Sequence, residues 1–390
     1  MALSAFGARS RRFNWDTRPL LVLAGAGAVA LAWFAYAHAI HPARPGALNP
    51  PGWYGFFDQS HYLGLARDLA RGDLPAGPDY IYGLGYPVLA VPFVKLRPGG
   101  DPFVVVDALA FVATMVMVVV LGGRLRSAAF GLGCAGALAV ATPLLDTMVV
   151  PWNTTVTVVA VLCTLVVATS PGPLRWPHGL ALGLAVGMAF AARYVDALFP
   201  ALIGGATLLR SGRSAWRAWL AAGAMAVLIA VLVLASHAAV HGSPWKSPYS
   251  QQPGKKGAGS NQQTLSNFEL GRAPRNFVEV FVTGKSGSRR QTVDPLGRQF
   301  VWALLAPLGL FVLVRRRHKL SGPFAVAMAT SVLATVFYLS YPGSRGDHLL
   351  YGNIHYWKAW FPLWALLAAY GFLAFTDPLR RVEGARLTQD

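Results

Sequence analysis

Charged residues are scarce in this chain of 390 residues. Asp, Glu, Lys and Arg together make up 13% of it, about half of the ~25% that is usual in soluble domains. Cysteine is nearly absent: Cys134 and Cys163 each lie inside an apolar run, and neither belongs to a Cys-x-x-Cys pair or a Cys/His group. These shortages exclude a secreted disulfide scaffold and a disordered chain, and they give no support to a zinc or redox site.

Apolar residues are abundant instead. Hydrophobic residue types make up 54% of the chain, and its mean hydropathy is +0.44. Several apolar runs reach or approach ~20 residues, the length that crosses a bilayer as a helix. The net charge of +18 would suggest nucleic-acid binding in a soluble protein, but in a membrane protein basic residues orient the spans and contact anionic lipids. The sequence therefore predicts an all-α polytopic membrane protein with no nucleic-acid partner.

The apolar runs predict about ten transmembrane helices in a single integral membrane domain, residues 1–390. The first run is longer than the ~7–15-residue core of a signal peptide, so we expect it to be retained as a span. Another run, 85–94, is too short to cross and is expected to enter the membrane only partly. The expected spans are 19–40, 102–121, 128–147, 154–170, 179–192, 197–209, 218–240, 299–314, 322–341 and 356–376.

Basic residues cluster in the short connections after the second, fourth, sixth and eighth expected spans. The positive-inside rule places these connections in the cytoplasm, together with the terminal segments 1–18 and 377–390. Three segments are then expected outside: 41–101, 241–298 and 342–355. Because function usually resides in connecting segments held by a rigid scaffold, we expect a site on the outer face of an inner (plasma) membrane.

The first outer segment contains a predicted amphipathic helix. Tyr62, Leu65 and Leu69 recur at helical spacing, and Gly72 marks the end of the pattern. We expect this helix to lie at the outer membrane interface. Asp58, just before it, has two interpretations: it caps the helix, where Asp is favoured, or it is a general base held at the membrane surface.

A first span, then Asp58-x-x-x-Tyr62, and then Tyr82-x-x-Gly85-Tyr86-Pro87 with a short apolar run follow one another in the first third of the chain. This order resembles the GT-C superfamily of polytopic glycosyltransferases, which includes protein O-mannosyltransferases and lipid A aminoarabinose transferases. The resemblance implies that the acidic residue soon after the first span, Asp58 here, acts at the reaction centre. It also implies a donor sugar carried on a polyprenyl phosphate, and chemistry on the outer face of the membrane.

The resemblance extends to further residues. Tyr62 belongs to the same motif and is expected to bind substrate. Asp146, in the second outer connection, matches the position of another acid in relatives and is expected to be catalytic; the alternative is a carboxylate that only reaches outer water. Asp107 is a weaker candidate. Many relatives have Glu where this chain has Gln59, which leaves the metal dependence and the acid–base arrangement open. We expect no cofactor, with a divalent metal as the alternative.

Arg193 lies between two short apolar runs, where GT-C members commonly have an arginine. A lipid-phosphate donor needs positive charge at the outer surface, and a guanidinium matches pairs of phosphate oxygens. Arg193 is therefore expected to bind the donor phosphate. The alternative is an ion pair with Asp196, at i, i+3 spacing, that only stabilises the loop.

The last outer connection places basic and aromatic residues beside the start of the final span. Arg345, His355 and Lys358 are expected to bind substrate as a cradle for phosphate or pyrophosphate. His355 and Lys358 are three residues apart, a spacing that puts both on one helical face. The alternative is the ordinary interfacial belt of Trp, Tyr and basic anchors.

Together these features predict a membrane glycosyltransferase that moves a sugar from a polyprenyl-phosphate donor to a glycan, lipid or protein acceptor. Asp58 would take the proton of the acceptor hydroxyl while basic residues stabilise the departing phosphate. Two alternatives stay open. A transporter or flippase of a lipid-linked precursor would have ionisable residues deep in several helices and broken helices in two halves. A non-catalytic scaffold could also keep the fold.

Overall fold

The computed structural model is helical throughout the part of the chain that it describes, and no β-strand occurs there. This confirms the predicted all-α class. The described residues are 18–42, 53, 57–74, 80–97, 99–246, 248, 269–284, 295–340 and 353–386. The longer helices are α1 (Arg18–Ile40), α2 (Phe57–Arg71), α3 (Gly85–Leu96), α4 (Phe103–Leu125), α5 (Ala128–Ala139), α6 (Thr142–Val149), α7 (Thr154–Ala168), α8 (Trp176–Ala192), α9 (Leu198–Ser211), α10 (Trp216–His241), α14 (Trp302–Arg315), α15 (Ser321–Leu339) and α16 (Phe361–Arg386). The short ones are η2 (Tyr194–Ala197), η3 (Arg213–Ala215), η5 (Leu270–Arg272), α12 (Ala273–Phe277), η6 (Val278–Thr283), α13 (Leu296–Gln299) and η9 (Asn353–Tyr356).

Four of the described helices are long and apolar enough to cross a membrane: α1, α4, α15 and the helix formed by η3 with α10. The bent pair of α5 and α6 makes a fifth if it is counted as one span. Several other expected spans are helices of only 14 to 17 residues, among them α7, α8 and α14. At 1.5 Å per residue they are shorter than the ~30 Å hydrocarbon core. By length and composition, four or five of the described helices are full-length candidate spans of a membrane protein, and the expected count of ten is not confirmed.

The predicted span 128–147 is not one helix. α5 ends at Ala139, α6 begins at Thr142, and the two are bent by 68°. Pro143 has no N–H to donate to the carbonyl of Ala139, as a continuous helix would require. The indole N–H of Trp33 in α1 donates to that carbonyl instead, at 2.7 Å. The bend therefore turns α6 away from the axis of α5, and α6 packs against α1.

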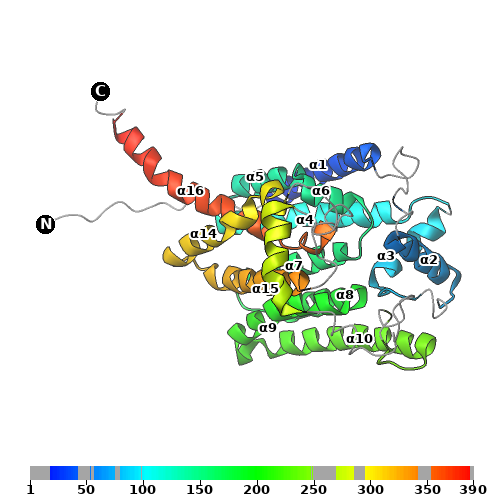
Figure 1. The fold of residues 1–390 in the computed structure, drawn as a ribbon. Coiled ribbons are helices and arrows are strands. Elements are labelled where there is room, and N and C mark those ends of the chain that lie inside the picture. Colours follow the sequence, from blue (N-terminus) through cyan, green and yellow to red (C-terminus); the bar gives the residue numbers. More distant parts are fainter. Residues whose placement is uncertain are drawn as a thin grey trace.

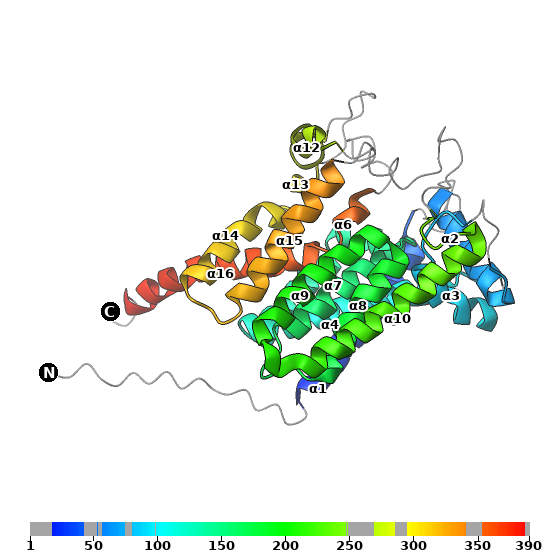
Figure 2. The same ribbon diagram turned by 90° about the horizontal axis from the view of Figure 1, so that it is seen from below.

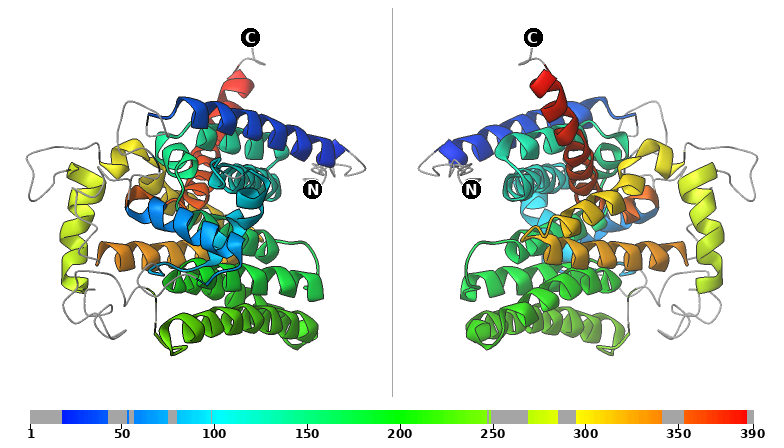
Figure 3. Two further views of the ribbon diagram at one scale, coloured as in Figure 1. Left: turned by 90° about the vertical axis from the view of Figure 1, so that its right-hand side faces the viewer. Right: turned by 90° about the vertical axis from the view of Figure 1, so that its left-hand side faces the viewer.

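The helices form a bundle with α4 in the interior and with α1 and α10 on opposite sides (Figures 1 and 3). In the most apolar 18-residue stretch of each helix, 56% of the residues of α4 are buried, against 17% for α1 and 11% for the helix that contains α10. α2 and α3 lie together at one end (Figure 2). The segment formed by α12 and η6 runs across the long helices (Figure 3). α1 and α10 thus present most of their apolar surface outward, as lipid-facing helices do.

A glycine stripe joins α8 to α10. Gly179, Gly183 and Gly187 recur every fourth residue, and all three face α10. A Cβ atom on Gly179 would lie 2.1 Å from the carbonyl oxygen of Ala218, so the two backbones touch where no larger residue fits. Small residues at four-residue spacing let two helices approach this closely, so the stripe packs α8 against α10.

Candidate functional site

α2 is the amphipathic helix that the spacing predicts. Tyr62 and Ala66 are at most 1% exposed, and Gly72 ends the helix with a φ of +86°. The Tyr62 ring meets the ring of Tyr82 at a centroid distance of 5.1 Å and that of Tyr86 at 5.5 Å. The apolar face of α2 is therefore covered by protein and not by lipid, and Tyr62 supports the neighbouring tyrosines from behind.

Asp58 lies in the first turn of α2, and its carboxylate accepts a hydrogen bond from the hydroxyl of Tyr82 at 2.5 Å. This contact directs the carboxylate toward the segment before α3. Burial raises the pKa of Asp58 above its usual range, against the smaller lowering effects of Tyr82, Arg193 and His61. A half-buried carboxyl with a raised pKa is suited to general-base chemistry.

A close backbone approach brings the Tyr82 segment against the end of α8. A Cβ atom on Gly83 would lie 2.4 Å from the carbonyl oxygen of Ala191, a distance that only glycine permits. Arg193 directly follows α8. The contact therefore fixes the Tyr82 segment against the end of α8, and the guanidinium charge of Arg193 acts to lower the pKa of Asp58.

The guanidinium of Arg193 lies over two aromatic rings. Its central carbon is 4.8 Å from the ring centroid of Tyr356 and 5.6 Å from that of Tyr338. These two rings are stacked on each other, 4.8 Å apart. The side chain of Arg193 is 17% exposed. Cation–π contact therefore fixes the charge in place while part of the side chain still reaches the surface.

The ion pair of Arg193 with Asp196, the alternative that the sequence left open, is present but long: Nε and Oδ1 are 3.8 Å apart. Asp196 is 1% exposed and has nearer partners. Its carboxylate accepts hydrogen bonds from Thr157 Oγ1 at 2.6 Å and from the hydroxyl of Tyr338. Asp196 thus anchors the ring of Tyr338, over which Arg193 lies, and does not form a close ion pair with Arg193.

His355 lies in η9, next to the same arginine. It is 3% exposed, its ring stacks on Trp152 at a centroid distance of 3.9 Å, and its Nδ1 is 3.1 Å from Thr154 Oγ1. Burial lowers the pKa of His355 well below its usual range, and the charges of Arg193 and Lys358 lower it further. The imidazole is therefore neutral at pH 7, so any contact with phosphate would be a hydrogen bond and not an ion pair.

Lys358 is completely buried in the turn between η9 and α16. Its Nζ donates to the carbonyl of Thr147 at 2.9 Å and to Thr155 Oγ1 at 2.7 Å. Asp107 of α4, which is 1% exposed, hydrogen-bonds with Thr155 and interacts electrostatically with Lys358. The hydroxyl of Tyr86 donates to both oxygens of Asp107, at 2.8 and 2.9 Å. Lys358 and Asp107 thus share Thr155 as a hydrogen-bond partner, and this buried network ties α3, α4, α6 and α7 to the turn before α16.

Residues from distant parts of the chain thus meet at one place, which we call the Asp58–Arg193 cluster. Its members are Asp58, Tyr82, Arg193, Asp196, Tyr338, His355 and Tyr356. The chain matches no protein-family model and no curated protein. What the cluster can do is therefore argued from its own chemistry: a carboxyl with a raised pKa can accept a proton, and an aromatic-backed guanidinium can bind an anion.

Gln59, next to Asp58, does not face the cluster. It is fully buried, and its Nε2 donates to the carbonyl of Pro151 at 3.1 Å. An ionised carboxylate could not donate this hydrogen bond, so the amide suits this environment. Pro151 directly precedes Trp152, on which His355 stacks. Gln59 therefore anchors α2 to the segment that supports His355.

The other predicted site residues are placed as follows. Asp146 is 52% exposed and pairs with His41, at 3.7 Å between Oδ1 and Nε2, and no contact with the Asp58–Arg193 cluster is found for it among the described residues. Arg345 lies outside the described residues. No group of three or more His, Cys, Asp or Glu side chains that could hold a metal ion occurs in the described part of the chain.

Sequence reasoning missed the tyrosines that complete the cluster. Tyr82 belongs to the motif that carries the resemblance, yet nothing in its spacing shows that it bonds Asp58. Tyr338 lies inside an apolar run and Tyr356 at the start of one, where tyrosine is ordinary. The one available signal was the glycine pair flanking Leu84, since glycines beside a tyrosine indicate a close backbone approach.

Proposed function

We propose that this protein is a membrane glycosyltransferase, similar to the GT-C superfamily, that transfers a sugar from a polyprenyl-phosphate donor to an acceptor hydroxyl. The observation that carries the proposal is the meeting of Asp58 and Arg193. Displacement at an anomeric carbon needs a base for the acceptor and a cation for the leaving phosphate. Asp58, in the first turn of α2, and Arg193, just after α8, supply these two groups within electrostatic reach of each other.

In the proposed reaction, Asp58 takes the proton of the acceptor hydroxyl as the acceptor oxygen bonds to the anomeric carbon. The bond between that carbon and the phosphate oxygen breaks, and its electron pair leaves with the phosphate. Arg193 stabilises the new negative charge, because a guanidinium can donate two parallel hydrogen bonds to phosphate oxygens. Tyr82 holds Asp58 in orientation.

The remaining predicted residues have different proposed roles. His355 lines the site as a neutral hydrogen-bonding ring. Lys358 is fully buried and already bonded to two protein acceptors, so we assign it a positioning role, with its charge felt across the cluster. Arg345 stays a predicted phosphate contact, and Tyr62 acts through Tyr82.

The proposal includes a topology of ten spans with both termini in the cytoplasm of an inner (plasma) membrane. The support is the basic character of the connections assigned to the inside. Single cysteines at Ser60 and Ser321, in a chain without Cys134 and Cys163, test it in intact cells. Labelling by an impermeant thiol reagent is expected at Ser60 and not at Ser321, and the reverse pattern would invert the topology.

The decisive experiment is a transfer assay with the full chain in liposomes. A synthetic short-chain polyprenyl-phosphate sugar is supplied, and extracts of envelope glycan, lipid and protein serve as acceptors. We expect release of polyprenyl phosphate that depends on acceptor. A donor that stays intact with every acceptor, in a chain that is folded, would reject the proposal. Comparing envelope glycans of a deletion strain with its parent would then name the sugar.

A flippase for a lipid-linked precursor is the second candidate, favoured by two observations. α5 and α6 form a bent pair, and two ionisable side chains, Asp107 and Lys358, are buried within the bundle. Both are features of transport proteins. The same liposomes distinguish the candidates, because a flippase would move an intact fluorescent donor between leaflets without cleaving it.

A further inference from the structure

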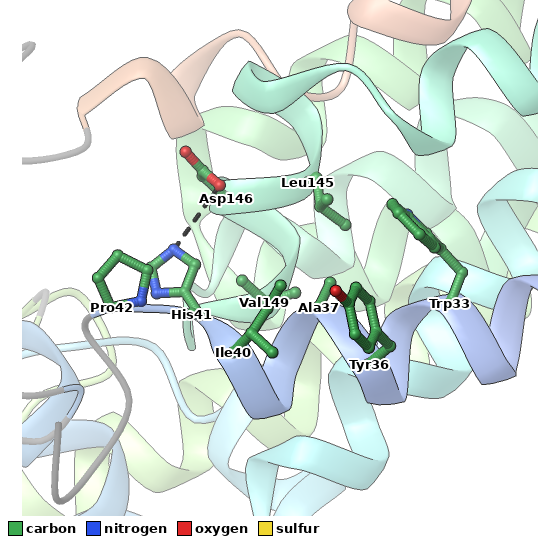
Figure 4. Close-up of a pocket in the computed structure, with 9 residues that line it drawn as sticks. All are labelled: Trp33, Tyr36, Ala37, Ile40, His41, Pro42, Leu145, Asp146 and Val149. Atoms are coloured by element: carbon green, nitrogen blue, oxygen red, sulfur yellow. Dashed lines mark ion pairs between the residues drawn. The ribbon is translucent and has the colours of Figure 1, made fainter.

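A groove separate from the Asp58–Arg193 cluster lies between α1 and α6, with a volume of about 170 Å³ (Figure 4). Trp33 lies at one end of it, while His41 and Asp146 face each other across the other end. Tyr36, Leu145 and further apolar side chains line the length between. We call this the α1–α6 groove. Its polarity is graded: one ion pair at one end and apolar surface along the rest.

The polar end of the groove lies where the membrane surface is expected, and the apolar end lies deeper in the bilayer. The apolar span of α1 is Pro19–Ile40, 22 residues long, or roughly 33 Å at 1.5 Å per residue, which matches the ~30 Å core of a bilayer. His41 therefore lies at the interface, and Trp33, eight residues earlier in the chain, lies about 12 Å deeper. Because only 17% of the apolar window of α1 is buried, this part of the molecule is open to lipid.

The size of the groove limits its occupant. A cavity of about 150 Å³ holds one benzene molecule, so 170 Å³ accommodates about six to eight carbon atoms. Drug-sized ligands need roughly 300 Å³ or more. A free sugar would fit by volume, but it would leave its hydroxyls unpaired against the apolar lining. A hydrocarbon chain with a polar head at the interface satisfies both ends.

We propose that the α1–α6 groove binds one membrane phospholipid whose headgroup contains a primary ammonium and a phosphate. The first carbons of an acyl chain occupy the apolar length between Trp33 and Leu145. The ammonium donates to the carboxylate of Asp146, which is 52% exposed, and an imidazole N–H of His41 donates to the phosphate. This site is independent of the proposed transferase chemistry.

The two polar residues explain why this headgroup is preferred. A choline headgroup has no N–H to donate to Asp146, and a glycerol headgroup places no positive charge there. An ethanolamine headgroup has both the charge and the N–H groups. Because the site is half exposed, we expect the preference for ethanolamine over choline and glycerol headgroups to be modest, roughly three- to tenfold.

The test is lipid binding to the delipidated full chain in detergent, followed by native mass spectrometry. Phosphatidylethanolamine, phosphatidylcholine and phosphatidylglycerol with identical acyl chains are compared. We expect one tightly held lipid per chain, with the ethanolamine lipid preferred. Asp146→Asn should remove the preference. The matched control is Asp73→Asn, which alters an exposed carboxylate that pairs with Arg71 at the end of α2 and should keep the preference.

A second variant fills the groove. Leu145→Trp should weaken binding of all three lipids, since it occupies the space of the acyl chain. The proposal is overturned if the wild-type chain has no headgroup preference, if the preference survives Asp146→Asn, or if Leu145→Trp leaves binding unchanged. The last result would mean that the retained lipid lies elsewhere on the surface. Far-ultraviolet circular dichroism confirms that each variant is folded.

Discussion

The Asp58–Arg193 cluster is mostly buried, whereas the α1–α6 groove opens outward between two helices. Asp58 has a hydroxyl donor at 2.5 Å and an arginine within electrostatic reach. Asp146 is half exposed, and its partner His41 is 3.7 Å away. The two carboxylates therefore differ in what they are suited to: Asp58 to the proton transfer that we propose, and Asp146 to the headgroup contact that we propose.

Of the variants considered, Asp58→Asn should reduce the rate of transfer most. The amide keeps the shape and can still accept the Tyr82 hydrogen bond, but it cannot take a proton, so transfer should fall by roughly 10²–10⁴-fold. In the wild type the pKa of Asp58 is raised, so activity should decline as pH falls through a value above ~4, the usual pKa of the group. Transfer rates across pH check both statements. Asp68→Asn, which alters a partly exposed carboxylate on the same helix that pairs with Arg71, serves as control.

Among these variants, Lys358→Met should lower the free energy of unfolding most. Lys358→Met leaves the carboxylate of Asp107 buried without its counter-charge, and breaking such a pair typically costs about 3–5 kcal/mol. The free energy of unfolding in mixed detergent micelles measures this. Replacing the exposed Lys95 by Met should change little. The double variant Lys358→Met with Asp107→Asn should recover part of the loss, and a double variant as unstable as the single one would show that the two charges do not interact.

Variants of Arg193 test whether the cluster binds the donor phosphate. Arg193→Ala should weaken productive use of the polyprenyl-phosphate donor by roughly 10–150-fold, the value of a charged hydrogen bond. Arg193→Lys should recover only part of this, because the ammonium lacks the planar fork. Transfer rate against donor concentration is the measurement, with Arg71→Lys on the exposed face of α2 as control. If only the dependence on acceptor changed, Arg193 would bind something other than the donor.

Tyr82→Phe tests the orientation of Asp58 alone. The variant removes the hydroxyl that lowers the pKa of Asp58, so the acid limb of the pH profile should move to higher pH. Loss of one hydrogen bond to a charged group should reduce transfer by about tenfold. A lower rate with an unmoved acid limb would assign Tyr82 to packing only.

Asp146→Asn should have the smallest effect on transfer, less than about fivefold, as for other exposed ion pairs. Its effect should instead appear in the choice of lipid. A loss comparable to that of Asp58→Asn would restore the catalytic role that its position in the sequence predicts. The same transfer assay gives the answer.

Helices, their apolar faces and the glycine stripe of α8 could be predicted because they depend on local periodicity. The amphipathic pattern after Asp58 and the four-residue spacing of the glycines correspond to what the structure contains. Arg193 and His355 were selected by residue type and position, and both belong to the cluster. Local spacing thus identified several members of the site without showing how they meet.

The rest depends on contacts between distant residues. The bend after Ala139 is stabilised by Trp33, more than 100 residues earlier in the chain, and it is this bend that directs Asp146 to α1. Likewise, nothing near Lys358 indicates that its amino group is bonded to Thr147 and Thr155. A basic residue beside aromatics looks the same in sequence whether it faces a substrate or a buried carboxylate.

The backbone contact at Gly83 also constrains how the molecule can move. Gly85 makes the same kind of approach, since its Cβ would lie 2.6 Å from the nitrogen of Ala192. Two such contacts couple the start of α3 and the end of α8 into one rigid block, and Asp58 and Arg193 are held by it. A displacement of the start of α3 therefore has to carry the end of α8 with it, so that Tyr82 and Arg193 move together.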